Sequence, residues 1–208
     1  KPVGVAAHPS QGFEGPSVTG VLAARGYRIS TSGAPERRGV VQRLDVGTSG
    51  VMVLAKSEPA YSHLKQQFRD RTPQKVYHAL VQGLPDPLRG TIDAPIDRHP
   101  TERVRMAVRE GGRDSVTHYR VIARFRANTH VRVQLETGRT HQIRVHLAHA
   151  GYPIVGDRVY GGRLTLPKGA SETLRTALRE FPRQALHAAR LQLDHPVTGR
   201  PLECLAPL

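Results

Sequence analysis

The sequence predicts an α+β domain with a largely antiparallel mixed sheet flanked by helices and loops. Segments with strand character outnumber those with helical spacing, and short turns join most of them. No internal repeat and no clear linker interrupts the chain. The length of 208 residues suffices for one hydrophobic core, so we expect a single domain over residues 1–208.

The predicted strands rest on apolar runs and on alternation. Val131, Val133 and Leu135 alternate with charged or amide side chains, which gives residues 129–136 one apolar face and one polar face. Residues 51–55 form a continuous apolar run that is typical of a buried strand. The other segments with strand composition are residues 74–84, 115–125, 186–193 and 202–206.

Three helices are predicted from caps and apolar spacing. Ser57 can cap the first helix with its side-chain oxygen, and a proline follows in the first turn. Thr140 can cap the second, which should end near Gly151. Residues 173–181 suggest a third, short helix. Residues 28–39 are rich in Ser, Gly, Pro and Arg, so we expect a mobile loop there.

The charge balance points to a polyanionic partner. The chain has 31 basic residues against 17 acidic ones, a formal net charge of +14, and 26 of the basic residues are arginines. Arginine offers a flat fork for phosphate and a face for stacking on bases. The alternative is a solvated basic surface with no such partner. On composition alone both interpretations stay open.

Other classes of protein are disfavoured by composition. Cys204 is the only cysteine, so the chain can form neither an internal disulfide nor a zinc site built from several cysteines. No apolar run approaches the roughly 20 residues that span a bilayer, and no signal-peptide pattern opens the chain. We therefore expect a cytoplasmic protein with no membrane partner.

Two polar segments are candidates for chemistry. Asp45 lies in a loop between Val40-Val41 and the apolar run 51–55, although an aspartate in such a loop is usually a turn residue. Further along, Arg139 and Arg144 lie at a predicted strand-to-helix junction, a position suited to phosphate. An arginine beside a buried aspartate would keep that carboxylate ionised, as a nucleophile or base requires.

Four blocks in chain order resemble the RluA-type family of RNA pseudouridine synthases. The signature block is Gln42-Arg43-Leu44-Asp45-Val46-Gly47-Thr48-Ser49-Gly50. The other three are Lys1-Pro2-Val3-Gly4 with His8-Pro9; Lys75-Val76-Tyr77 through Gly83; and Thr137-Gly138-Arg139-Thr140-His141-Gln142-Ile143-Arg144 through Gly156-Asp157 and Tyr160-Gly161. The resemblance covers essentially the whole chain, and the order of four blocks makes it specific.

The resemblance implies a catalytic domain with the family's α+β fold and an isomerase activity that converts uridine in structured RNA to pseudouridine. It assigns Asp45 as the catalytic aspartate, Tyr77 as the aromatic residue that stacks on the target base, and Arg144 as the ion-pair partner of Asp45. The reaction needs no redox change, so we expect no cofactor and no metal. The expected substrate-binding residues are Arg43, Thr48, Arg139, His141 and Gln142.

One position departs from the family pattern. Many relatives have histidine where this chain has Gln42, and an amide can hydrogen-bond but cannot carry charge. The departure puts a proton-transfer role for this position in doubt and leaves the assignment of Asp45 intact. His141, His146 and His149 lie close in sequence, but their helical spacing and the absence of paired cysteines disfavour a metal site, and we interpret His141 as a hydrogen-bonding neighbour of the site.

Several alternatives stay open at this point. A non-catalytic RNA-binding factor for ribosome assembly would explain the charge, and a nucleoside glycosidase would explain an essential carboxylate but normally needs two. The Arg-rich stretch 98–113 is either a solvated hairpin or an element that grips RNA. The family motifs do not separate ribosomal from transfer RNA. We expect a monomer, and an upstream RNA-binding domain missing from this chain is consistent with its start at Lys1.

Overall fold

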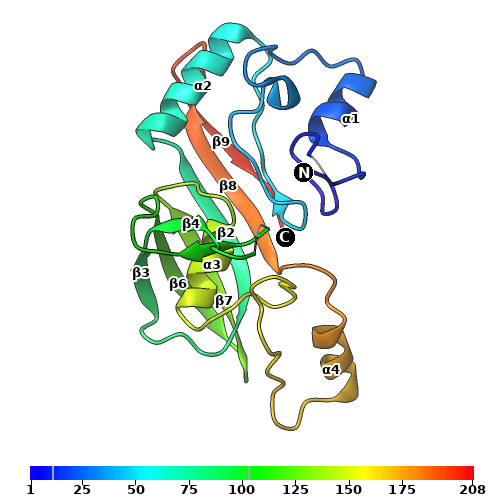
Figure 1. Ribbon diagram of the computed structural model, residues 1–208, viewed down its shortest axis with the longest axis vertical. Coiled ribbons are helices and arrows are strands. Elements are labelled where there is room, and N and C mark those ends of the chain that lie inside the picture. Colours follow the sequence, from blue (N-terminus) through cyan, green and yellow to red (C-terminus); the bar gives the residue numbers. More distant parts are fainter. Residues whose placement is uncertain (11, 103) are drawn as a thin grey trace. The chain divides into compact units, whose positions relative to one another are not determined.

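The computed structural model describes residues 1–10, 12–102 and 104–208 (Figure 1). The chain divides into two compact units, Lys1–Lys75 with Ala188–Leu208 and Val76–His187. Helices and mostly antiparallel strands make up both, which confirms the predicted α+β class. None of the helices in the described part of the chain is long and apolar enough to cross a membrane.

The first unit packs a long helix against a short sheet. Strand β8 (Leu186–Asp194), most of which lies in this unit, pairs antiparallel with β9 (Pro201–Leu205), and β1 (Ser49–Gly50) also joins β8. The unit also contains α1 (Val18–Ala24), the 3-10 turn η1 (Pro35–Arg37) and α2 (Glu58–Asp70). Its core consists of apolar side chains from α2, β8 and the loops: Val41, Ala55, Ala60, Leu64, Leu191 and Leu193.

Helix α2 begins where its sequence predicts. The Ser57 hydroxyl accepts a hydrogen bond from the Ala60 amide at 3.4 Å, and a proline occupies the first turn. The helix ends at Arg71, whose left-handed backbone closes the last turn. Ala60 and Leu64 are buried against the core of the first unit, as the helical spacing of the apolar residues requires.

The prediction of a strand over residues 51–55 is wrong. Only Ser49–Gly50 is a strand, and the following residues run as an extended segment. The Val51 amide bonds to Ala188 at 2.8 Å, whereas the Ala55 amide bonds to Gly39 at 2.9 Å. Because the two ends of the segment bond to different neighbours, no continuous ladder forms. The apolar side chains of Val51 and Val53 nevertheless pack against the core, which accounts for the apolar run.

The second unit is built on an antiparallel sheet in the order β2-β7-β6-β3. The strands β2 (Gln74–Gln82), β6 (Val116–Arg124) and β7 (Asn128–Leu135) confirm three predictions, and β3 (Arg89–Asp93) was not predicted. Strands β4 (Ile96–Arg98) and β5 (Met106–Val108) pair separately. Strand β4 ends at the start of the Arg-rich stretch 98–113, and β5 lies within it. Arg103 of this stretch falls outside the described residues.

One face of this sheet is the core of the second unit. Val81, Val131 and Val133 are fully buried there. Helix α3 (Gln142–His149) lies over β6 and β5 (Figure 1), and His146 on α3 bonds to Thr117 of β6 at 2.9 Å. His146 also bonds to the Ala94 carbonyl at 2.9 Å, so it is a satisfied core histidine.

Two helix starts differ from the predictions. The N-cap of α3 is His141 rather than Thr140, its backbone is left-handed with φ 57°, and its side chain makes no capping bond. The start of this helix is therefore fixed by contacts beyond the helix, described below. Helix α4 (Glu172–Arg179) begins one residue before the predicted start, because the Ser171 hydroxyl accepts from the Leu174 amide at 3.2 Å.

Candidate active site

Asp45 opens a β-turn in the first unit. The Thr48 amide donates to the Asp45 carbonyl at 3.0 Å, and aspartate is common at the first position of such turns. The side chain of Thr48 is buried, and Asp45 itself is half-buried. The turn thus fixes the backbone of residues 45–48, so the direction in which the Asp45 carboxylate leaves the chain is set locally. We call residues 42–50 the Asp45 loop.

Backbone bonds attach the Asp45 loop to the first residues of the chain. The Gly4 amide donates to the Val46 carbonyl at 3.0 Å, and the backbone nitrogen of Lys1 donates to the Gly50 carbonyl at 2.8 Å. The side-chain ammonium of Lys1 also donates to the carbonyls of Val5 at 2.6 Å and Val46 at 3.2 Å. The opening block of the resemblance therefore has a structural purpose, which is to hold the loop that carries Asp45.

Gly50 ends the loop at a position that only glycine fits. Its φ is +122°, and a Cβ there would overlap the backbone of Ala188 on β8. This close approach lets β1 lie directly against β8. The glycine at the end of the signature block is thus required by packing.

In the second unit, Arg144 forms a buried, two-point ion pair with Asp157. Nε donates to Oδ2 at 2.7 Å and Nη2 to Oδ1 at 2.9 Å, and the side chains are 7% and 0% exposed. Burial opposes the charge on Asp157, but the bonds and charge of Arg144, together with the amides of Tyr160 and Val159, outweigh it and lower the pKa of this carboxyl. Asp157 is therefore a charged, fixed support for Arg144.

Tyr160 covers the other side of this arginine. The Arg144 guanidinium lies 4.9 Å from the centre of the Tyr160 ring, and Arg105 lies 5.5 Å from it. The Tyr160 hydroxyl accepts from the Met106 amide at 2.8 Å and hydrogen-bonds with Nδ1 of His141 at 2.9 Å. Burial raises the pKa of Tyr160, so its hydroxyl stays protonated. We call His141, Arg144, Asp157 and Tyr160 the Arg144 network.

Glycines flank the acidic partner in this network. A Cβ at Gly161 would overlap the Asp157 carbonyl, and a Cβ at Gly156 would overlap the Arg183 carbonyl. The Gly161 amide donates to the Asp157 carbonyl at 2.8 Å, which completes the turn. The pairs Gly156-Asp157 and Tyr160-Gly161 belong to the block that begins at Thr137, and the resemblance implies no role for them. The structure assigns them the support of Arg144, and this role could not be inferred from spacing.

Gln142 uses its whole amide inside the second unit. Its Oε1 accepts from the Thr137 hydroxyl at 2.8 Å and the Arg139 amide at 2.9 Å, and its Nε2 donates to Val116 and Thr117 at 3.0 Å each. An amide has two acceptor sites and two donors, and all four are used here. These bonds fix the junction of β7 and α3. They favour a structural role, and substrate binding by Gln142 stays a prediction without support.

The remaining predicted residues lie in both units. Tyr77 is a buried residue of β2, opposite Val133 in the sheet and on its core face. Arg139 is half-buried and donates from Nε to the Asp114 carbonyl at 3.1 Å. Arg43 is exposed in the Asp45 loop. Tyr77, Arg139, His141 and Arg144 thus share the second unit, whereas Arg43, Asp45 and Thr48 share the first.

No group of three or more His, Cys, Asp or Glu side chains within residues 1–10, 12–102 and 104–208 is arranged to hold a metal ion. His141 and His146 each have hydrogen-bond partners inside the second unit.

Known proteins match this chain over its whole length. A family profile described as RNA pseudouridylate synthase matches residues 1–149. The chain belongs to this family of RNA pseudouridylate synthases. The resemblance to the RluA-type branch is confirmed. The Ribosomal large subunit pseudouridine synthase D of Pseudomonas aeruginosa is 50% identical over 208 residues, 100% of this chain and 64% of that protein.

Two further matches agree. An uncharacterized RNA pseudouridine synthase of Mycobacterium bovis is 54% identical over 207 residues, 100% of this chain and 64% of that protein. The solved structure of Human RNA Pseudouridylate Synthase Domain Containing 4 has a TM-score of 0.71 and 26% identity, over 100% of this chain and 83% of that one. The chain thus spans somewhat less than two thirds of the length of its curated relatives.

Proposed function

We propose that this chain is the catalytic part of an RNA pseudouridine synthase that acts on ribosomal RNA of the large subunit, with Asp45 as the catalytic carboxylate. The observation that carries the proposal is the position of Asp45 in a turn whose loop is attached by backbone bonds at Val46 and Gly50, inside a chain that belongs to the family. The choice of ribosomal RNA rests on the names of the relatives, which are ribosomal large subunit pseudouridine synthases.

The reaction is an isomerisation. The bond from ribose C1′ to uracil N1 breaks, the ring turns, C5 joins C1′, and the C5 proton is replaced by one at N1. A carboxylate can attack C1′ and form a temporary ester, as in retaining glycosidases. It can alternatively remove the C2′ proton to give a glycal. Both routes need an ionised, oriented carboxylate, and Asp45 is proposed for that role.

Tyr77 and Arg144 are proposed to complete the site. Stacking of the target uracil on Tyr77 would keep the released base in place and exclude water. Arg144 is proposed to support the charge of Asp45, and the bidentate bond to Asp157 holds this arginine in one orientation. Arg43, Thr48, Arg139 and His141 are proposed as RNA contacts around the site. We also propose that the protein acts in the cytoplasm as a monomer.

The test is site mapping of pseudouridine in unmodified large-subunit RNA and in bulk transfer RNA. Wild type should produce new pseudouridine in the ribosomal RNA, and Asp45→Asn should produce none while still binding it. Asp70→Asn, an exposed aspartate at the end of α2, is the matched control and should retain activity. Retained activity in Asp45→Asn would overturn the catalytic assignment. Modification of transfer RNA alone would overturn the proposed substrate, and release of free uracil would indicate a glycosidase.

A further inference from the structure

A row of three arginines crosses the sheet of the second unit. Arg89 on β3 lies opposite Arg120 on β6, and Arg120 lies opposite Arg132 on β7. We call these residues the arginine row. Residues directly opposite each other in an antiparallel pair have Cα atoms about 5 Å apart and point to the same face. His78 on β2 continues the row, because it lies opposite Arg132.

The arginine row lies on the face opposite the core. The residues that flank the row along the strands include Tyr77, Val131 and Val133, and these three are buried on the core face. Because side chains alternate along a strand, the row points away from that face. Arg89 and Arg120 are exposed and Arg132 is half-exposed. Side chains of the arginine row are therefore available to a partner on the outer face of the sheet.

No carboxylate in the described part of the chain neutralises the row. None of its three arginines takes part in an ion pair or a side-chain hydrogen bond among the described residues. By strand alternation Glu136 and Asp93 lie on the same face, but Glu136 bonds to His118 at 2.6 Å and Asp93 is at the far end of β3. Like charges placed directly opposite in a sheet are destabilising, so this arrangement opposes folding unless an anion binds it.

Two histidines lie beside the row and bond to each other. Nδ1 of His78 and Nε2 of His130 lie 2.7 Å apart, a hydrogen bond that requires at least one neutral ring. Burial, followed by the neighbouring His130, His187 and Arg132, lowers the pKa of His78. Burial is the largest cause of this shift, and the charge of Arg132 acts in the same direction.

We propose that the outer face of the β2-β7-β6-β3 sheet is a second RNA-binding surface, on which the arginine row contacts phosphates of the RNA backbone. A line of guanidinium groups about 10 Å long, at the spacing of β-strands, fits a series of backbone phosphates and reads no base sequence. This surface lies on the opposite side of the sheet from Tyr77. It would hold RNA away from the target uridine, and it goes beyond the proposed catalytic function.

The test measures binding of a short blunt-ended RNA duplex with no target site as a function of salt, using the 208-residue chain. The row variant is Arg89→Gln with Arg120→Gln and Arg132→Gln. The control variant is Arg126→Gln with Arg163→Gln and Arg179→Gln, three exposed arginines of the same unit outside the strands. Both variants lose the same charge, so a difference between them reports position.

The row variant should bind about tenfold more weakly at low salt, and the slope of log Kd against log salt should fall by about 2 to 3, since each phosphate contact adds about one unit. The control should lose less than about one unit of slope. Equal losses of RNA affinity in the two variants would mean that only the net charge matters, and the proposal would be overturned. Unchanged binding in the row variant would also overturn it. Turnover is not needed, so failure of the catalytic proposal leaves this test intact.

A thermal melt separates binding from folding. Removal of like charges that face one another should leave the Tm of the row variant equal to that of wild type or raise it. A lowered Tm would mean that the arginines stabilise the fold through other contacts, and the proposal would then lose its physical basis.

Discussion

The Asp45 loop and the Arg144 network solve the same problem in different ways. Each holds one polar side chain in a fixed orientation, but the loop is held by backbone bonds from Lys1 and Gly4, whereas Arg144 is held by a buried carboxylate. Backbone bonds tolerate most changes of side chain, provided that the glycines are kept. A buried ion pair tolerates substitution of neither residue, because removal of one partner leaves the other charged, buried and without a counter-ion.

This comparison predicts the largest effect for Asp157. Asp157→Ala leaves the Arg144 guanidinium buried without its two-point partner and should lower the free energy of unfolding by about 3–5 kcal/mol. Arg144→Ala should cost a similar amount, and the double variant should cost less than the sum. Urea denaturation of the four proteins measures the coupling. Additive losses would contradict the pairing.

The variant Asp157→Asn tests whether Asp157 orients Arg144 for catalysis or only stabilises the fold. An amide keeps the volume and one acceptor oxygen but loses the charge that orients Arg144. We expect kcat to fall by about tenfold or more while RNA affinity changes little. Loss of activity in parallel with loss of folded protein would instead mean that Asp157 has only a structural role. Measurement of kcat per folded molecule, at a temperature at which both proteins are folded, distinguishes the two.

A smaller effect is expected in the Asp45 loop, from Gly50→Ala. The added methyl must displace the backbone of Ala188 and also occupy a left-handed conformation, so we expect a loss of about 1–3 kcal/mol together with reduced turnover. Gly26→Ala is the matched control, because Gly26 has φ +75° in open space. The difference between the stability losses of Gly50→Ala and Gly26→Ala measures the part that is due to the close approach of Gly50 to β8. Equal losses would show that backbone conformation alone selects glycine.

Tyr160→Phe is expected to have a smaller effect again. The ring and its contact with Arg144 remain, but the Met106 amide and His141 each lose a hydrogen-bond partner. A loss of about 1–2 kcal/mol is the usual result for such a buried group. Thermal and urea denaturation measure it. Tyr152→Phe is a control, because among the described residues the Tyr152 hydroxyl accepts only a long bond of 3.4 Å, from the Asp86 amide.

The two regions also differ in what could be predicted from sequence. The Asp45 loop is contiguous, so its turn, its glycine and its aspartate all appear in one block. The Arg144 network joins residues 13 positions apart that meet only after α3 and the following turn have formed. Glu136 and Asp157 both lie within 15 positions of Arg144, and packing selects Asp157. The partner of Arg144 within its own unit was therefore missed, although Asp157 was quoted in the motif.

The fold shows the same division. Alternation predicted β7, because one face of this strand is the core, and strand composition predicted β6. The apolar run 51–55 was misread, since burial alone does not separate a strand from an extended segment with changing partners. Strands β3, β4 and β5 have only three to five residues each, too few for a periodic signal. Local chemistry is predictable here, and tertiary pairing is not.

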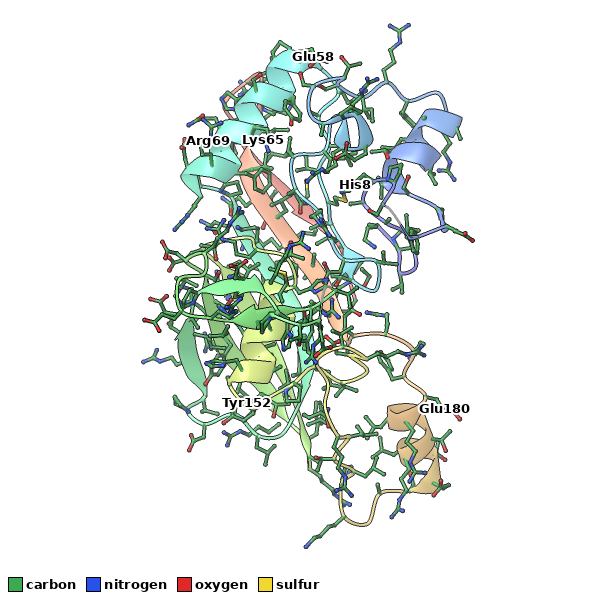
Figure 2. All side chains as sticks on the ribbon, in the orientation of Figure 1. His8, Glu58, Lys65, Arg69, Tyr152 and Glu180 are labelled. Atoms are coloured by element: carbon green, nitrogen blue, oxygen red, sulfur yellow. The ribbon has the colours of Figure 1, made fainter. Side chains whose placement is uncertain are left out.

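The smallest effect is expected at Glu58, which holds a second loop of the first unit. Residues 28–39, predicted to be mobile, are tied to α2 by the carboxylate of Glu58 in its first turn (Figure 2). This carboxylate accepts from the hydroxyls of Ser30 at 2.9 Å and Ser32, and from the Thr31 amide at 2.7 Å. Hydrogen bonds from Ser32, Thr31 and Ser30 lower the pKa of Glu58 to about 2.

The sign of the pH dependence follows from that pKa. Because the folded value of about 2 lies below the ordinary 4.5, the stabilisation by Glu58 is fully present above pH 4.5 and is lost as the pH falls toward 2. Glu58→Gln should therefore lower Tm slightly at neutral pH, and the difference from wild type should close between pH 4.5 and 2. Glu180→Gln, an exposed carboxylate at the end of α4, should show no such convergence. A Tm difference that stays constant down to pH 2 would mean that the charge on Glu58 does not stabilise the loop.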